Sequence, residues 1–337
     1  MTITHGGNLF AICRERGWDW RDVLDLSANV NPLGPPPGVR AAIEATLDRI
    51  GCYPDQTPVE LESVLASAWR VSPDMVLAGA GATELLHFFA RAGWQGPSAL
   101  VTPSGSELYR AFPHALRVAL DDPERWPQRG LLVLSQPVNP TGEEISETLV
   151  RRVVASREGL VLIDESYIDF TPLESAVGLC EHHPNLLVLR SLSKFYALPG
   201  LRIGALVGSP QLIARLRRRR EPWPVGVLAE AAARTAVADS EYPARSRELI
   251  ATERSWLLEQ LAPLDGLRLA HSAANFLFAA TDRPAQQIVD WFLDRKIVLR
   301  NCTGLPGVSG EAIRFAVRTR QENERFVVAA REFFWPA

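Results

Sequence analysis

Lys194 is one of only two lysines in a chain with 36 basic residues, and the other is Lys296. Arginine stays charged and is a poor nucleophile, whereas a desolvated lysine amine loses its proton and forms a Schiff base with an aldehyde. Lys194 is therefore a candidate for covalent chemistry that guanidinium cannot perform. Two lysines are also compatible with chance retention, so the residues around Lys194 must show whether it has a chemical role.

An aldehyde cofactor such as pyridoxal phosphate needs a carboxylate for its ring nitrogen and donors for its ring oxygen. Asp164 follows the apolar run GLVLI, where a strand end would desolvate it and suit it to keep the pyridine nitrogen protonated. Asn139, in PVNPTG, and Tyr167 can donate to the ring oxygen. Taken singly, Asp164 also suits a turn or helix cap, and Asn139 an ordinary Asn-Pro turn.

A phosphate site is indicated by AGAGATE, residues 78–84, where a strand would run through small residues into a helix. Backbone N–H groups at that helix N-terminus could bind a dianion. They belong to Gly81, Ala82 and Thr83. Hydroxyl and guanidinium partners for the same phosphate flank Lys194: Ser191, Ser193 and Arg202. The motif lacks the third glycine of a dinucleotide fingerprint, which disfavours a dehydrogenase.

Short apolar runs alternate with amphipathic stretches in the middle of the chain, which predicts an α/β fold with a largely parallel sheet. The expected strands are 98–103, 130–137, 159–166, 186–191 and 202–208, and the expected helices are 82–92 and 146–157. Polar residues follow several of these strands, at the carboxyl edge where open α/β sheets bind ligands.

Three regions are expected along the chain. Residues 1–26 would form an N-terminal arm that joins the small domain and serves as an active-site lid, and residues 27–230 a large α/β domain with helices on both faces of its sheet. Residues 231–337 would form a smaller α+β domain. Its expected strands are 267–270, 275–280, 296–301 and 312–317, with helices at 284–294 and 321–334 after a nearly wholly helical stretch at 227–261.

The composition excludes several other classes of protein. A net charge of -3 offers nucleic acid no general attraction, and no apolar run is long enough to span a bilayer, so we expect a cytoplasmic protein without a membrane partner. Four scattered cysteines with no C-x-x-C pair predict buried or half-buried reduced thiols and no metal site. The basic run RLRRRR, residues 215–220, predicts a solvated helix face.

Longer motifs connect these residues to a known family. DESYIDF, LRSLSKFYALPGLRIG and NPTG resemble the fold type I pyridoxal-phosphate enzymes of the histidinol-phosphate aminotransferase group. Within that group the chain most resembles the threonine-phosphate decarboxylases of cobalamin biosynthesis. The segments that carry this likeness are HGGN, SANVNPLGPP, YPD, EPW, LRNC, IRFAVRT and ENER, so the resemblance covers nearly the whole chain.

The resemblance implies a role for each candidate residue. Lys194 would bind the cofactor aldehyde, Asp164, Asn139 and Tyr167 its ring, and Ser191, Ser193 and Arg202 its phosphate. Tyr53 resembles the tyrosine that reaches this phosphate from a neighbouring subunit, which implies a homodimer with shared active sites. The residues implied to bind substrate are His5, Asn29, Asn139, Arg300 and Arg314. In PSGSELY, residues 103–109, Leu108 stands where relatives have an aromatic residue, and the nearest aromatic is Tyr109.

The resemblance implies decarboxylation of L-threonine O-3-phosphate to (R)-1-amino-2-propanol O-2-phosphate and carbon dioxide. The features that favour this lyase reaction are HGGN and EPW, which the transaminases of the group lack. Histidinol-phosphate aminotransferase activity is the alternative, because the cofactor breaks whichever Cα bond stands perpendicular to its ring. A non-catalytic relative that binds a phosphorylated amine is an alternative of another class.

Overall fold

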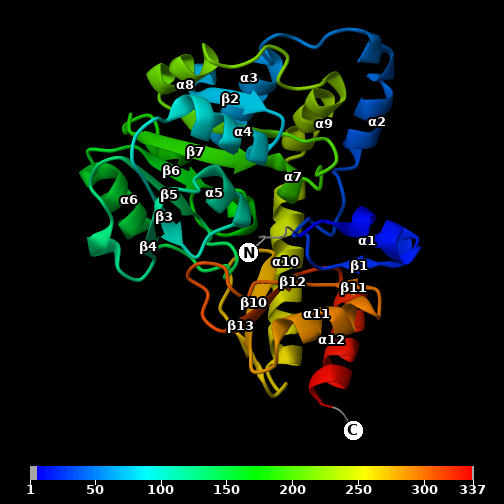
Figure 1. Ribbon diagram of the computed structural model, residues 1–337. Helices are drawn as coiled ribbons and strands as arrows, with labels where there is room; N and C mark the ends of the chain where they lie inside the picture. Colours follow the sequence, from blue (N-terminus) through cyan, green and yellow to red (C-terminus); the bar gives the residue numbers. More distant parts are fainter. Residues whose placement is uncertain (1–5, 336–337) are drawn as a thin grey trace.

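A seven-stranded sheet forms the centre of the larger part of the molecule in the computed structural model, which describes residues 6–335 (Figure 1). The strand order is β2-β8-β7-β6-β5-β3-β4, and the neighbours are parallel except for β8, which is antiparallel to both β2 and β7. The strands are β2 (Val76–Gly79), β3 (Ser98–Thr102), β4 (Leu116–Ala119), β5 (Leu131–Ser135), β6 (Val161–Asp164), β7 (Leu186–Ser191) and β8 (Gly204–Gly208). The predicted mainly parallel sheet is confirmed. The half-exposed edge strand β4 was not predicted, because it lacks a continuous apolar run.

Helices cover both faces of this sheet, because alternate strand residues point to opposite sides. One face packs against α4 (Ala82–Phe88), α5 (Ser106–Ala111) and α8 (Pro210–Arg217). The other packs against α2 (Gly38–Glu44), α3 (Val59–Trp69), α6 (Glu147–Ser156) and α9 (Val227–Ala238). In β6, for example, Leu162 packs on the face covered by α4, α5 and α8, whereas Val161 and Ile163 pack on the opposite face. The buried strands are held from both sides, which fixes their carboxyl ends rigidly.

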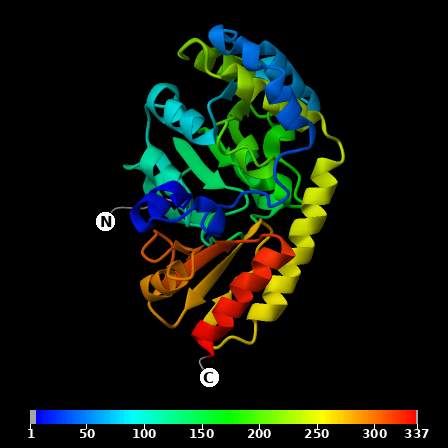
Figure 2. The same cartoon turned by 90° about the vertical axis from the view of Figure 1, so that its right-hand side faces the viewer.

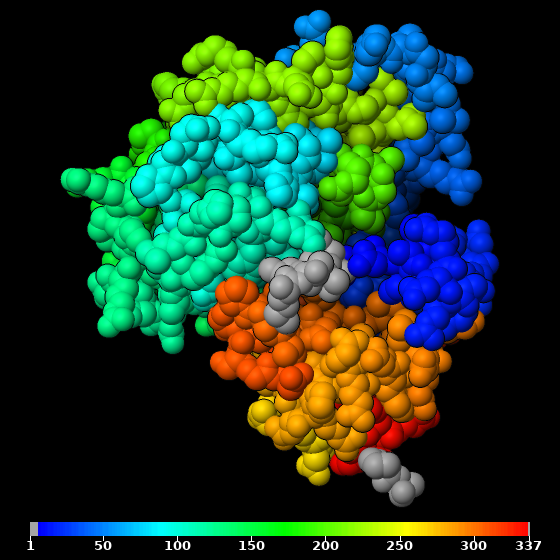
Figure 3. Space-filling view, in the orientation of Figure 1, coloured from blue at the N-terminus to red at the C-terminus, as the bar shows by residue number. Residues whose placement is uncertain are grey.

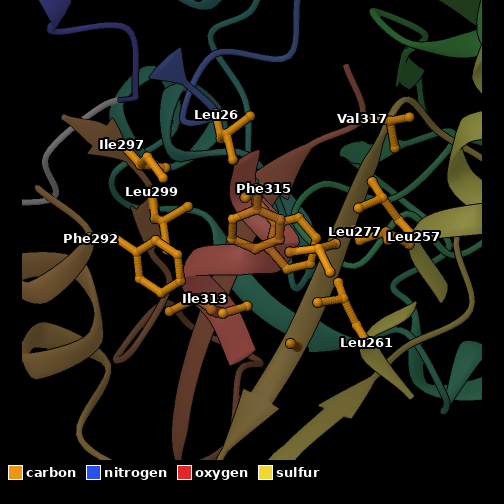
Figure 4. Packing of buried hydrophobic residues seen from close by; sticks show 14 of the residues in the cluster. Leu26, Leu257, Leu261, Leu277, Phe292, Ile297, Leu299, Ile313, Phe315 and Val317 are labelled. Carbon is orange, nitrogen blue, oxygen red and sulfur yellow. The ribbon is translucent and has the colours of Figure 1, made fainter. Parts of the chain in front are cut away.

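A smaller antiparallel sheet lies below the large one in Figure 1, with the order β12-β13-β10-β9. Its strands are β9 (Leu267–Leu269), β10 (Phe276–Thr281), β12 (Arg300–Asn301) and β13 (Glu311–Ala316). One face packs against α10 (Tyr242–Leu261), α11 (Ala285–Leu293) and α12 (Arg320–Phe334) around Ile313 and Phe315 (Figure 4). Arg314, between these two residues in β13, therefore points to the opposite face. No helix within residues 6–335 is long and apolar enough to cross a membrane.

The N-terminal segment is built into this smaller part. β1 (Leu24–Asp25) pairs in parallel with β11 (Ile297–Val298), and Leu26 bonds to both Val298 and Ala316 through its backbone. The stretch 296–301, predicted as one strand, is therefore two, because β11 pairs with β1 whereas β12 pairs with β13. α1 (Leu9–Arg16) lies against the C-terminal part of the chain (Figure 3).

The predicted limit between the large and small domains falls inside α9. Ala229, Ala232, Ala233 and Ala236 of this helix are buried with residues of α2, α3 and the large sheet. α10 begins at Tyr242 and runs down to the small sheet (Figure 2). α9 therefore packs as a whole with the large sheet, and the limit between the two domains stays a prediction.

The basic run 215–220 is only partly solvated. Arg215 and Arg218 are exposed, but Arg217 pairs with the buried Glu62 at 2.9 Å and Arg220 pairs with Glu84 at 2.7 Å. α8 ends at Arg217, and the chain then turns back over the β2 edge. The prediction of a solvated helix face is thus wrong for Arg217 and Arg220, because it took no account of the acidic side chains that α3 and α4 place beside them.

α12 begins with a capping box that includes the half-buried carboxylate of Glu322. Thr319 Oγ1 donates to Glu322 Oε2 at 2.6 Å and accepts from the Glu322 N–H, and Arg318 donates to Glu322 Oε1 at 2.8 Å. Burial alone raises the pKa of Glu322, but the bonds from Thr319 and Arg318 outweigh it and leave the pKa below its ordinary value.

We expect Glu322→Gln to lower the free energy of unfolding by about 1 kcal/mol at neutral pH. A lowered folded pKa gives stability that is present above the ordinary value of about 4.3 and is lost as the pH falls through the folded value, so the deficit should shrink in acid. Urea unfolding of the wild type and the variant, at neutral pH and near pH 4, measures this deficit in the free energy of unfolding. Glu324→Gln, exposed on the same helix, is the control. A deficit that is equally large in acid would contradict the prediction.

Candidate active site

A cavity of about 210 Å³ lies between the carboxyl ends of the large sheet's strands and the small sheet. It brings together residues that are as far apart in the sequence as Asn29 and Arg314. The candidate residues that line it are Asn29, Ala82, Thr83, Asn139, Asp164, Tyr167, Ser191, Ser193, Lys194, Arg202, Arg300 and Arg314. Gly6 and Gly7 of the HGGN motif line it as well.

Lys194 and Asp164 enter the cavity from adjacent parallel strands. Asp164 is the last residue of β6, and Lys194 lies in α7 (Leu192–Phe195), the single turn that follows β7. Asp164 Oδ1 accepts hydrogen bonds from the backbone N–H of Ser166 at 3.0 Å and from its hydroxyl at 2.5 Å. Burial raises the pKa of Asp164, while the Ser166 bonds and the nearby Lys194 charge act in the opposite direction. A cationic partner such as a protonated pyridine nitrogen would offset this burial cost.

An anion pocket is formed where α4 begins. Ala82 and Thr83 line the cavity, and Arg202 Nη1 lies 3.5 Å from Ser193 Oγ. Gly81 has a φ of +93°, and a Cβ there would lie 2.5 Å from Arg202 Nη2. Gly81 itself does not line the cavity. It leaves room for the Arg202 guanidinium to approach the helix, which suits a phosphate bound by both.

Arg300 and Arg314 stand directly opposite each other on the antiparallel strands β12 and β13. Both are only 8% exposed, and like charges in such a pair repel. Arg314 donates to Asn139 Oδ1 at 2.7 Å and to the Ser27 carbonyl at 2.8 Å, but its buried Nε has no partner among residues 6–335. Burial lowers the pKa of Arg300, and the charge of Arg314 adds to this effect. An anionic ligand would relieve both the repulsion and the burial cost.

Asn29 and Tyr167 form a polar pair at the cavity wall. Asn29 Nδ2 donates to the Tyr167 hydroxyl at 3.3 Å, so the hydroxyl proton remains available for an acceptor in the cavity. The buried Oδ1 of Asn29 has no partner within the described part of the chain. The Tyr167 ring packs edge-on against Phe276 at 5.1 Å, which holds it in place.

Tyr53, like Gly81, is not among the residues that line this cavity. Tyr53 is 80% exposed and stacks on Trp223 at 4.7 Å, so its reach into a neighbouring subunit stays a prediction. His5 lies outside the described residues. Leu108 lines the cavity, whereas Tyr109 does not; its hydroxyl accepts from Ser104 N–H and donates to the Pro306 carbonyl, each at 2.9 Å.

Several lining residues were missed from the sequence. They include Ser27, Ser106, Glu107, Ser166, Cys302 and Leu305. The spacing of Asp164 and Ser166 in DES is typical of an aspartate that accepts from a residue two positions on, so this partner was detectable. Three of the four cysteines are buried as expected, but Cys52 is exposed. Residues 6–335 contain no group of three or more histidine, cysteine or acidic side chains that could hold a metal.

The fold and the site place the chain in a known class of protein. Residues 107–329 match the family of aminotransferases of class I and II, and the chain belongs to this family. It is a fold type I enzyme that depends on pyridoxal 5'-phosphate, and the donors around the cavity fit this cofactor: an acid at the end of one strand, a lysine in the helical turn after the next strand and an anion pocket at a helix N-terminus.

Relatives with two activities match most of the chain. Threonine-phosphate decarboxylase of Salmonella typhimurium is 33% identical, with 97% of this chain and 95% of the relative covered. Histidinol-phosphate aminotransferase of Gluconacetobacter diazotrophicus is 35% identical, with 89% and 88% covered. The structure of histidinol-phosphate aminotransferase from Sinorhizobium meliloti in complex with pyridoxal-5'-phosphate superposes with a TM-score of 0.86 at 22% identity, covering 99% of this chain and 95% of that one.

Proposed function

We propose that the protein is a threonine-phosphate decarboxylase, which converts L-threonine O-3-phosphate to (R)-1-amino-2-propanol O-2-phosphate and carbon dioxide in cobalamin biosynthesis. The observation that carries the proposal is the buried pair Arg300 and Arg314, opposite each other at one end of the cavity. The substrate has two anionic groups, a carboxylate and a phosphate, and guanidinium groups bind both in a bidentate manner. The decarboxylase relative and the Gly6–Gly7 segment in the cavity wall also support it.

The cofactor supplies an electron-accepting ring that stabilises the negative charge left on Cα when one of its bonds breaks. Asp164 would hold the proton on the ring nitrogen, and Asn139 and Tyr167 would donate to the ring oxygen. Ser191, Ser193 and Arg202 would bind the cofactor phosphate, together with the backbone N–H groups of Ala82 and Thr83. Lys194 would hold the cofactor through its aldehyde group.

The arginine pair would decide which Cα bond breaks. Binding of the substrate phosphate by the pair would leave the substrate carboxylate without a guanidinium partner, which would favour its loss as carbon dioxide. Lys194 Nζ, at the carboxyl end of the sheet, would then return a proton to Cα after carbon dioxide leaves. Asn29, beside Tyr167, would help to orient the substrate.

Histidinol-phosphate aminotransferase activity is the alternative, supported by relatives of equal identity. In that reaction Arg314 would hold a substrate carboxylate in place, and Lys194 would move the Cα proton. A non-catalytic protein that binds a phosphorylated amine is a third candidate. The observation that favours this third candidate is that Leu108, which lines the cavity, offers the cofactor ring no aromatic face.

We expect the purified protein, with pyridoxal phosphate, to release carbon dioxide from L-threonine O-3-phosphate and to form the amino alcohol phosphate stoichiometrically. Trapping of labelled carbon dioxide measures the reaction. L-threonine, which lacks the phosphate, is the matched control and should react slowly. Amino-group exchange between histidinol phosphate and 2-oxoglutarate, without release of gas, would decide for the aminotransferase.

We also propose that the enzyme is a cytoplasmic homodimer with shared active sites. Large apolar side chains are exposed along one segment and beside it: Leu47, Ile50, Tyr53, Val59 and Trp223. Such a patch is typical of a surface that another subunit covers. Tyr53 would then reach the cofactor phosphate of the partner subunit.

A further inference from the structure

Ser27 lies at the point where the N-terminal segment, the cavity and Arg314 meet. It is 3% exposed and lines the cavity. Its hydroxyl accepts a hydrogen bond from the Gly7 N–H at 3.0 Å, and its carbonyl accepts one from Arg314 Nη2 at 2.8 Å. One buried serine therefore joins the glycine segment to the guanidinium that we propose for substrate binding.

Gly6 touches the same carbonyl from the other side. A Cβ on Gly6 would lie 2.3 Å from the Ser27 oxygen, far inside van der Waals contact, and Gly7 has a φ of +81°. Any side chain at Gly6 would have to push this oxygen away from its place, and Arg314 is bound to that oxygen. Gly6 is therefore required by the position of the Ser27 carbonyl, whereas Gly7 is required by its own left-handed φ, since a Cβ on Gly7 would meet nothing within 4 Å.

Asp25 sets the direction of the Ser27 hydroxyl. Its Oδ1 accepts both the Ser27 O–H at 2.6 Å and the Ser27 N–H at 2.9 Å. Because the hydroxyl proton is committed to Asp25, a lone pair of Ser27 Oγ faces the Gly7 N–H. Asp25 itself is held by the pairing of β1 with β11, where it stands opposite Val298.

We propose that Ser27 is a positioning residue that couples the Gly6–Gly7 segment to Arg314. An anion bound to Arg314 then orders the segment, and the ordered segment raises the affinity of Arg314 for the anion. The coupling must be reciprocal, since both events share one carbonyl and one hydroxyl. The inference rests on the proposed function only for the choice of L-threonine O-3-phosphate as the anion.

The test compares Ser27→Ala and Gly6→Ala with the wild type, all loaded with pyridoxal phosphate. We expect KM for L-threonine O-3-phosphate to rise about fivefold to tenfold in Ser27→Ala, because one buried hydrogen bond is lost, and more in Gly6→Ala. The cofactor absorbance should not change, and kcat should change less than KM. Asp25→Ala should show a smaller rise, and Asp25→Asn, which keeps the acceptor oxygen, should recover most of it.

Hydrogen exchange gives a readout that does not depend on turnover. In the wild type, L-threonine O-3-phosphate should slow exchange of the backbone amides of residues 7–16, and this protection should be lost in both variants. Ser63→Ala and Gly178→Ala are matched controls, since Ser63 is exposed and a Cβ on Gly178 would meet nothing within 4 Å. If Ser27→Ala does not fold, Gly6→Ala tests the same carbonyl.

Two results would overturn the coupling: variants with the KM of their controls, or wild-type protection that persists in both variants. A different result would overturn only the proposed function. If the wild type releases no carbon dioxide, yet the phosphate compound protects residues 7–16 and the variants abolish this protection, the coupling stands and the reaction is another one.

Discussion

Lys194→Ala is expected to lose the visible absorbance that arises from the bond between lysine and cofactor, and to lose at least about 10²- to 10⁴-fold in kcat. The lysine holds the cofactor aldehyde and is the amine in the cavity placed to move a proton at Cα, so both roles disappear together. Absorbance spectra and carbon dioxide release measure the two losses. The prediction holds for an aminotransferase as well, because that reaction also needs an amine to move the Cα proton.

Lys296→Ala is the matched control, because Lys296 is the other lysine of the chain. Its Nζ pairs with Asp22 at 3.2 Å near the surface, an interaction of about 0–1 kcal/mol, so cofactor binding and turnover should remain. Borohydride reduction of the wild type should fix the cofactor on the peptide that contains Lys194. Cofactor fixed on Lys296, or a Lys194→Ala protein that keeps both the absorbance and turnover, would refute the assignment.

Arg314→Ala is expected to lower kcat/KM for L-threonine O-3-phosphate about 10²- to 10³-fold. Loss of a charge-assisted pair of hydrogen bonds costs about 3–4 kcal/mol, which corresponds to this factor. The change also removes the donors to Asn139 and to the Ser27 carbonyl, so the cavity loses order as well as charge. Arg314→Lys should recover only a small part, because an ammonium group cannot make two parallel bonds.

Steady-state kinetics of Arg300→Ala, Arg314→Ala and the double variant measure how the two guanidinium groups act together. If one ligand binds both, the two effects should not add, because the first loss already displaces the ligand. Arg268→Ala, exposed on the edge strand β9 and paired with Asp282, is the control within the same sheet. A decrease of less than tenfold in Arg314→Ala would show that substrate anions bind elsewhere.

The central sheet was predicted from sequence because its signal is local. β5, β6 and β7 are continuous apolar runs, and strands buried on both faces need no more than that to be recognised. Lys194 and Asp164 could be found for a related reason. Each follows such a run, and residues at the carboxyl ends of adjacent parallel strands must come close together.

Other features depend on contacts between distant segments, which no local pattern contains. The strand break at Leu299 exists because β1, more than 250 residues earlier, supplies the partner of β11. The partial burial of Arg217 and Arg220 depends on Glu62 and Glu84, from α3 and α4. The packing of α9 is a third example, since its alanines contact α2 and α3.

For this protein, the sequence by itself determined the α/β class, the strands at whose ends Asp164 and Lys194 lie, and the family resemblance. Only the tertiary structure decided that Arg300 and Arg314 are opposite neighbours, that Tyr109 points away from the cavity, and that Ser27 joins the glycine segment to Arg314. The physical reason is the distance along the chain over which each kind of interaction acts. Alternation and apolar runs act between residues a few positions apart, whereas strand register and the direction of a buried side chain are set by whatever packs against it.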